Sequence, residues 1–220
     1  MTTPALVAAP LIIAPLIIAI DGPAAAGKGT LARRLAAHLN LPYLDTGLLY
    51  RATARRLLDA NGDPSNPTEA EHAARTLQPA DLDRTNLRTP EIDRAAAAVA
   101  SAPPVRAALL DFQRNFATQN GAVLDGRDIG TIIFPNAQAK LFITATVQAR
   151  AHRRWLELTA RGLIIPEETV RADMQARDAA DASRAAAPLR PAPDALILDT
   201  TTLTADQAFE AARLHVESTR

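Results

Sequence analysis

Residues 22–30, GPAAAGKGT, have the residue types and spacing needed to hold a chain of phosphates. They follow a short apolar run and precede a stretch with leucines at helical spacing, which is the context of a phosphate-binding loop. Glycines at 22 and 27 allow backbone N–H groups to point inward, and the N-terminus of the following helix adds partial positive charge. Lys28 can reach the β- and γ-phosphates of a nucleotide. The predicted ATP-binding residues are Gly22, Pro23, Ala24, Ala25, Ala26, Gly27, Lys28, Gly29 and Thr30.

A carboxylate near this loop could order a metal ion. Asp125 follows the apolar residues AVL at the end of a predicted strand. A carboxylate at such a strand end suits Mg²⁺ held through water. The assignment of Asp125 as a metal residue is stronger because the chain also contains a phosphate loop. We predict Mg²⁺ as the cofactor, with ATP as co-substrate. The predicted metal residues are Thr30 and Asp125.

Arginines could supply a second anion site. A kinase holds two polyanions head to head, so well-placed cations must offset their repulsion. The chain has only two lysines, Lys28 and Lys140, and the arginine fork fits phosphate oxygens better than a point charge does. Arg51 and Arg127 follow glycine-bearing turns at predicted strand ends. The other candidate arginines are Arg106, Arg153, Arg154, Arg177 and Arg184.

The elements that would position these residues alternate between strands and helices. Short apolar runs predict five strands over 16–21, 41–45, 121–126, 139–145 and 194–200. Helical periodicity falls between them, over 28–39, 47–60, 104–119 and 204–218. This alternation indicates βαβ units and a parallel sheet covered on both faces. We therefore predict an α/β fold, a three-layer α/β/α P-loop kinase fold with a five-stranded parallel sheet.

Three other segments complete the predicted organisation. Residues 1–15 are apolar but lack the basic start of a signal peptide, and Pro4, Pro10 and Pro15 break the run well short of the roughly 18 residues that a membrane helix needs. We predict an N-terminal extension over 1–15 and a cytoplasmic protein that is not a membrane protein. The stretch 69–105 predicts a small helical insertion, and 147–187 an arginine-rich helical region.

Composition excludes several function classes. The 24 basic and 24 acidic side chains cancel, which argues against a nucleic-acid binder. The chain has no cysteine, so thiolate chemistry and disulfides are excluded, and its four histidines lack ligand spacing. A GTPase would need Asn-Lys-x-Asp and a protein kinase His-Arg-Asp, and neither motif occurs. We expect a monomer, because no long apolar stripe is evident after residue 20.

Six blocks in the same order resemble the bacterial cytidylate kinases. They are GPAAAGKGT (22–30), LDTGLLYRA (44–52), LDGRDIGTIIFP (124–135), RAHRRW (150–155), RDAADASRAAAPL (177–189) and DALILDTTTLT (194–204). The resemblance runs from about residue 16 to the C-terminus. It implies a nucleoside-monophosphate kinase domain over 16–220, with an acceptor-binding insertion over about 47–119 and a helical lid over about 147–187. It also implies transfer of the γ-phosphoryl group of ATP to CMP or dCMP with Mg²⁺.

The resemblance assigns roles to individual residues. Arg51 and Arg127 would hold the acceptor phosphate, and Asp181 and Arg184 would meet the pentose. Arg106 and Asp128 would read the cytosine edge. The implied CMP-binding residues are Thr46, Tyr50, Arg51, Arg106, Arg127, Asp128, Arg177, Asp181 and Arg184. The implied catalytic residues are Lys28, Asp125, Arg127, Arg153 and Arg154, with Arg150, Arg153 and Arg154 in the lid near the transferring phosphoryl group.

One departure from the family pattern bears on the base. Ala97 stands where the family has a serine thought to touch cytosine, and the lost hydrogen bond is worth on the order of 0.5–1.5 kcal/mol. The sequence therefore indicates catalysis more firmly than a preference for cytosine over uracil, and two alternatives to a cytidylate kinase stay open. One is a kinase of another small acceptor, either UMP or a non-nucleotide. The other is a nucleotide-binding module without turnover.

Overall fold

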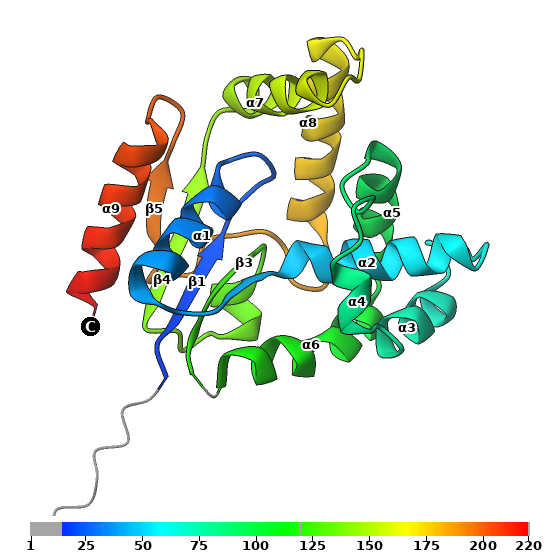
Figure 1. Cartoon of the computed structure of the whole chain (residues 1–220), viewed down its shortest axis with the longest axis horizontal. Coiled ribbons are helices and arrows are strands. Elements are labelled where there is room, and N and C mark those ends of the chain that lie inside the picture. Colours follow the sequence, from blue (N-terminus) through cyan, green and yellow to red (C-terminus); the bar gives the residue numbers. More distant parts are fainter. Residues whose placement is uncertain (1–14, 119, 220) are drawn as a thin grey trace, which may run out of the picture.

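Five parallel strands form the sheet at the centre of the computed structural model, which describes residues 15–118 and 120–219 (Figure 1). The strands are β1 (Ile17–Asp21), β2 (Tyr43–Asp45), β3 (Ala122–Gly126), β4 (Ala139–Thr144) and β5 (Leu196–Asp199), in the order β2-β3-β1-β4-β5. Every neighbouring pair is parallel, which confirms the predicted five-stranded parallel sheet. The predicted extension 1–15 lies, apart from Pro15, outside the described residues.

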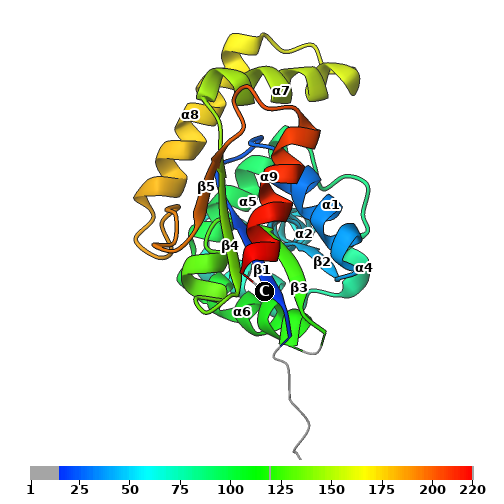
Figure 2. The same cartoon turned by 90° about the vertical axis from the view of Figure 1, so that its left-hand side faces the viewer.

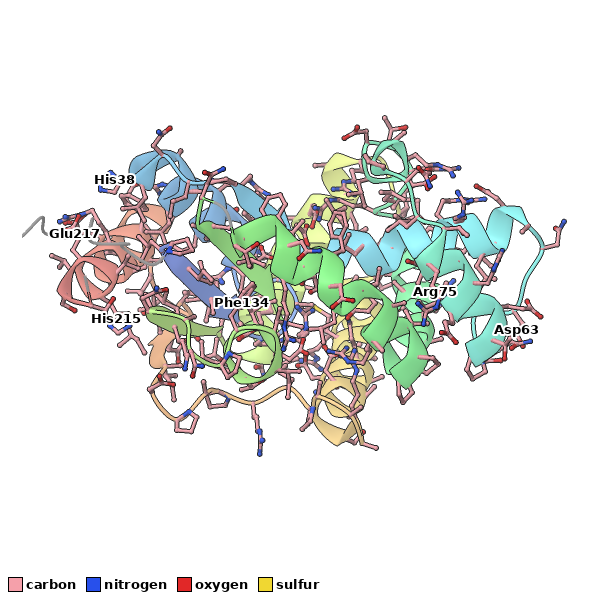
Figure 3. The ribbon with its side chains drawn as sticks, turned by 90° about the horizontal axis from the view of Figure 1, so that it is seen from below. His38, Asp63, Arg75, Phe134, His215 and Glu217 are labelled. Atoms are coloured by element: carbon pink, nitrogen blue, oxygen red, sulfur yellow. The ribbon has the colours of Figure 1, made fainter. Side chains whose placement is uncertain are left out.

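Helices cover both faces of the sheet. On one face lie α1 (Lys28–Leu39) and α9 (Ala205–Ser218), whose Leu35 and Val216 are fully buried against strand residues such as Ile20. On the other face lie α6 (Pro103–Thr118) and a π-helical turn, η1 (Ile129–Ile133). This arrangement confirms the predicted three-layer α/β/α fold. His38 and Glu217 meet where α1 and α9 end, with Nε2 and Oε1 3.5 Å apart (Figure 3).

Four helices precede α6 and pack beside the sheet. They are α2 (Thr46–Asp59), α3 (Pro67–Arg75), α4 (Pro79–Leu82) and α5 (Pro90–Ser101). Prolines open the last three of these helices, where a missing N–H costs nothing and the fixed φ suits a helix start. The side chains of Asn66 and Thr89 accept hydrogen bonds from the first-turn N–H groups of α3 and α5. We call α2–α6 the insertion, and its role in binding an acceptor stays a prediction.

Two helices lie over the carboxyl ends of the strands. Figure 2 shows α7 (Val147–Ala160) crossing above β4 and β5, and α8 (Glu167–Ser183) running down from it. A small apolar core, made of Ala151, Leu158, Val170 and Met174, joins them. We call α7 and α8 the lid helices, and their action as a lid stays a prediction. Among the described residues, no helix is both long and apolar enough to span a membrane.

The five strands and the helices α1, α2, α6 and α9 begin and end within about two residues of their predicted places. The helices α3–α5 and α7–α8 were expected only as two broad helical stretches, and η1 was not predicted from the sequence. Its first two N–H groups, on Ile129 and Gly130, donate to the two carboxylate oxygens of Asp21, each at 2.8 Å. Asp21 lies at the end of β1, more than a hundred residues earlier. This turn therefore depends on a long-range contact that local periodicity does not reveal.

Candidate active site

The loop between β1 and α1 has the conformation that its glycines predict. Gly22 has φ +142°, and a Cβ there would lie 2.0 Å from the carbonyl oxygen of Ile143. Gly27, with φ +90°, opens α1 in the left-handed region. Only glycine satisfies the close approach at position 22. The chain thus turns tightly from the strand into the helix, and the N-terminus of α1 points into the site.

Ala25 is the unexpected residue of this loop. Its φ is +57°, a left-handed conformation that costs a residue with a Cβ about 1–2 kcal/mol. The side chains of Ala24 and Ala25 pack against the apolar core of the lid helices. The loop therefore contacts the lid directly, and that packing offsets part of the backbone strain.

Lys28 reaches back over the loop. Its Nζ donates to the carbonyl oxygen of Pro23 at 2.8 Å, and the side chain is buried. Burial and then the positive charge of Arg127 lower the pKa of Lys28, and Arg177 acts in the same direction. These arginines therefore lie close enough for their charge to reach Lys28. A bound polyanion would relieve their mutual repulsion.

Asp125 lies beside the loop at the end of β3. The sheet pairs it with Asp45 at the end of β2, and Tyr43 donates its hydroxyl to Asp125 Oδ2 at 2.9 Å. The hydroxyl of Thr46 donates to the carbonyl oxygen of Asp125 at 2.8 Å. Burial, reinforced by the negative charge of Asp45, raises the pKa of Asp125.

Asp45 also pairs with Arg88 at 2.6 Å, whereas Asp125 has no salt bridge among the described residues. Carboxylate oxygens at this point suit a divalent cation such as Mg²⁺. Within the described ranges, no group of three or more His, Asp or Glu side chains could hold a metal by itself. Asp125 and Asp45 would therefore share Mg²⁺ with water and phosphate oxygens. Thr30 is exposed and lines the hollow described below, and no hydrogen bond between its side chain and Asp125 is seen in the described part of the chain. Its role at the metal stays a prediction.

The predicted acceptor residues form three groups, each centred on an aspartate. In the first group, Asp181 of α8 accepts Arg127 Nε at 2.8 Å through one oxygen and pairs with Arg184 through the other. Asp181 is buried, and its two arginines come from the end of β3 and the end of α8. The structure thus brings together three of the predicted CMP-binding residues.

The second group joins Arg106 of α6 to Asp128, which directly precedes η1. The guanidinium carbon of Arg106 lies 5.7 Å from the centroid of the Tyr50 ring, within cation–π range. Arg106 also donates to the carbonyl oxygen of Ala100 at 3.3 Å. All three of these side chains were predicted to bind the acceptor.

The third group is centred on Asp93, which was not predicted. One of its oxygens accepts Arg51 Nε at 2.9 Å, and the other accepts Arg154 Nη2 at 2.7 Å. Arg177 Nη1 lies 3.9 Å from the first oxygen. Burial and then the charge of Arg127 lower the pKa of Arg177 to about 10.

Arg153 and Arg154 are neighbours in sequence but face different parts of the site. Arg153 donates to the hydroxyl of Thr200 at 3.1 Å and to its carbonyl oxygen at 2.5 Å, near the phosphate loop. It lines a hollow of about 180 Å³. The walls of this hollow include Gly27, Thr30, Arg153, Thr200, Leu203 and Ala208. Arg153 therefore lies on the loop side, whereas Arg154 joins the third aspartate group.

Arg150 fixes the start of the lid. Its Nε donates to the carbonyl oxygen of Ala145 at 2.9 Å, and its Nη1 to that of Ala24 at 3.3 Å. Both terminal nitrogens also bond the carboxylate of Asp178 on α8, at 3.2 and 2.6 Å. The side chain of Arg150 is buried, whereas that of its partner Asp178 is partly exposed. Arg150 is thus a structural link between loop and lid.

Sequence reasoning missed several residues of the site. Asp21 directly precedes the first loop glycine, and Asp45 directly precedes Thr46, so their positions at strand ends were visible. Thr200 likewise ends the predicted strand 194–200. Asp93 carried no such signal, because it contacts Arg51, 42 residues away, and Arg154, 61 residues away.

A glycine turn with a buried lysine at the carboxyl edge of a parallel sheet, with arginine groups close to it, defines a P-loop kinase. A family model described as "Cytidylate kinase" matches residues 18–217 of this chain. The chain therefore belongs to that family.

Relatives of known name agree over most of the chain. The cytidylate kinase of Acidiphilium cryptum (strain JF-5) is 65% identical over 198 residues, which are 90% of this chain and 93% of that one. The cytidylate kinase of Granulibacter bethesdensis (strain ATCC BAA-1260 / CGDNIH1) is 63% identical over 197 residues, covering 90% and 94%. The crystal structure of an uncharacterized protein from Eubacterium ventriosum ATCC 27560 has a TM-score of 0.54 at 16% identity, over 92% and 99% of the two chains. That likeness supports the fold alone.

Proposed function

We propose that the protein transfers the γ-phosphoryl group of ATP to CMP or dCMP, giving ADP and CDP or dCDP. The observation that carries the proposal is the pairing of Asp21, directly before the phosphate loop, with Gly126, directly before Arg127. This register places an arginine beside the loop that holds the buried Lys28. Two polyanions held head to head need this distribution of charge. The relatives at 65% and 63% identity, both named cytidylate kinase, supply the acceptor.

ATP would bind through the loop, residues Gly22 to Thr30, with Lys28 on its terminal phosphates. The hollow beside Thr30, Arg153 and Thr200 adjoins the N-terminus of α1 and suits the nucleoside part of ATP. Mg²⁺ would be held by Asp125 and Asp45 and would offset charge on the phosphates. Water and phosphate oxygens would complete its coordination.

CMP would bind among the three aspartate groups. Arg51 and Arg127 would hold its phosphate, and Arg177 has a buried Nε without a partner among the described residues, which leaves a donor for an anion. Asp181 and Arg184 would meet the pentose. Arg106 and Asp128 would face the base, with Thr46 and Tyr50 supporting them.

The transfer needs positioning and charge neutralisation more than covalent chemistry. A phosphate oxygen of CMP attacks the γ-phosphorus in line while the bond to ADP breaks, and no enzyme-bound intermediate forms. Lys28, Arg127 and Arg154 would follow the charge on the transferring group. The lid helices would exclude water, which is the competing acceptor.

An acceptor screen tests the proposal. Release of ADP and formation of each product are measured with CMP, dCMP, UMP, AMP and shikimate. We expect turnover with CMP and dCMP and none with AMP or shikimate. UMP should also turn over to some extent, because Ala97 lacks the hydroxyl that would help to distinguish cytosine from uracil. ATP binding without turnover of any acceptor would contradict the proposal in favour of a nucleotide-binding module. Preference for another acceptor would leave a kinase but change its substrate.

We further propose that the protein works as a cytoplasmic monomer that binds neither nucleic acid nor membranes. The balanced charge of the chain and the lack of a membrane-spanning helix in its described part support this. Sedimentation at micromolar concentration tests the monomer, and a dimer would contradict it.

A further inference from the structure

Asp93 occupies the point where three arginines from three helices converge. It lies in the first turn of α5, Arg51 lies on α2, and Arg154 and Arg177 lie on the two lid helices. Its two oxygens accept from Arg51 and Arg154 at 2.9 and 2.7 Å. One carboxylate therefore ties the insertion to the lid.

This contact is shielded from water. The side chains of Asp93, Arg51 and Arg154 are 16%, 16% and 19% exposed, so charge interactions among them are stronger than those of a surface ion pair. Although burial opposes ionisation, the charges of Arg51, Arg177 and Arg154 hold the pKa of Asp93 below its ordinary value. Asp93 is therefore a fixed negative charge at neutral pH.

The carboxylate only partly satisfies its arginines. Three guanidinium groups face Asp93, and among the described residues only Arg154 also pairs with a second carboxylate, that of Glu157 at 2.8 Å. Positive charge therefore remains in excess. Arg51 commits its Nε to Asp93, and Arg154 commits its Nη2. A phosphate that takes these donors must displace the carboxylate or share them with it.

We propose that Asp93 is an internal counter-anion that competes with the acceptor phosphate for Arg51, Arg154 and Arg177 and holds the insertion to the lid until that phosphate binds. This inference rests on the proposed function. Asp93 is a positioning residue, since it acts through the arginines. Its competition disfavours a free phosphate, which lacks the additional binding energy that a nucleoside brings.

The competition is measured with Asp93→Asn, which keeps the size of the side chain and removes its charge. The loop is saturated with a non-hydrolysable ATP analogue, and binding of inorganic phosphate and of CMP is followed by calorimetry. We expect both anions to bind at least threefold more tightly than to the parent. In the kinase assay, KM for CMP falls by a similar factor while kcat changes less than twofold.

Two variants separate competition from a structural role. Asp93→Glu keeps the charge and should return both affinities to within twofold of the parent. Asp59→Asn removes a carboxylate of α2 that pairs with Arg55 and Arg84 outside the site, and it should leave both affinities unchanged. None of these substitutions removes a partner of another contact between lid and insertion, in which Arg161 Nη1 donates to the carbonyl oxygen of Arg88 at 3.0 Å.

A double-mutant cycle with Arg51→Ala completes the test, because residues that act together are not additive. The gain from Asp93→Asn should fall by at least half in the Arg51→Ala background. Unchanged or weaker binding of inorganic phosphate to Asp93→Asn would overturn the inference. Failure of the proposed function would instead appear as a parent protein that does not phosphorylate CMP, and the phosphate titration does not depend on that activity.

Discussion

The phosphate loop and the three aspartate groups hold charge by different means. The loop is one continuous segment whose conformation depends on glycines at 22 and 27 and on a single lysine. The aspartate groups combine side chains from α2, α5, α6, α7, α8 and the end of β3, joined by ion pairs. Substitution of one of these glycines or of the lysine should therefore abolish most of the activity. A single substitution among the arginines of the aspartate groups should instead weaken binding of the acceptor and leave binding of ATP unchanged.

The largest expected effect is that of Lys28→Ala. Removal of the cation that follows the transferring charge should lower kcat by about 10²–10³-fold, while the unfolding transition stays cooperative. Steady-state kinetics and thermal unfolding measure the two effects. Lys140→Ala is the matched control, since Lys140 is the other lysine and pairs with Asp194 instead. Equal loss of kcat in both variants would contradict the special role of the loop.

Arg51→Ala tests whether the arginine side separates from the loop. The lost charged hydrogen bonds to the acceptor are worth about 1.5–3 kcal/mol, so KM for CMP should rise about 10–100-fold. KM for ATP should stay within about twofold, because Arg51 belongs to the acceptor side alone. Arg55→Ala, on the same helix but paired with Asp59, should change neither constant. A parallel rise of both KM values would show that the two regions do not separate.

Asp21 joins the two regions, because it ends β1 and fixes the turn next to Arg127 and Asp128. Burial raises its pKa from 3.8 to about 6, so the folded protein binds more protons than the unfolded chain between those values. The free energy of unfolding should therefore fall through this interval as pH rises. The free energy of unfolding of Asp21→Asn should not fall in this way, because the amide does not ionise. The amide offers one oxygen acceptor in place of two, so the variant should be less stable than the parent at pH 4.5.

The stability gap between the parent and Asp21→Asn should narrow by about 1–3 kcal/mol by pH 7.5. Urea unfolding at both pH values measures it. Asp63→Asn is the control of opposite sign, because hydrogen bonds from Ser65 lower the pKa of Asp63. As pH rises, the parent should therefore gain on this variant only below about pH 4, and the gap between them should stay nearly constant from about pH 4.5 to 7.5. If the difference in the free energy of unfolding between the parent and Asp21→Asn did not change with pH, ionisation of Asp21 in the folded parent would carry no net cost, contrary to this prediction.

Ala25→Gly gives the smallest effect and tests the strain in the loop. Removal of the Cβ relieves the left-handed φ, worth about 1–2 kcal/mol, and costs about 0.5–1 kcal/mol of chain entropy. The variant should be as stable as the parent or up to about 1 kcal/mol more stable. Ala24→Gly has no left-handed φ to relieve and should lose about 0.5–1 kcal/mol. Equal losses in urea unfolding would mean that lid packing at position 25 outweighs its strain.

The sequence predicts those features of the fold and site that depend on residues close together in the chain. The five strands, the helix after Lys28 and the glycine turn follow from apolar runs and spacing, and the structure reproduces them. Arg51 and Arg127 could be singled out because each follows a glycine at a strand end.

Long-range pairing limits the rest. The sequence places Arg153 and Arg154 together, but successive residues of a helix point in different directions, and these two bond Thr200 and Asp93 respectively. Asp93 has no local pattern, since its role depends on how α5 packs against α2 and the lid. The turn η1 likewise depends on Asp21.

Arg150 restricts how the lid can move. It bonds carbonyl oxygens on both sides of the loop-to-lid junction and also holds α8. Rotation of α7 about its N-terminal end would break several of these hydrogen bonds at once and is therefore unfavourable in free energy. Bending at the far end meets less resistance, because Gly162 between the two helices has φ +81° and open space around it. Movement of the lid helices stays a prediction, and we expect its hinge to lie at this outer turn rather than beside the phosphate loop.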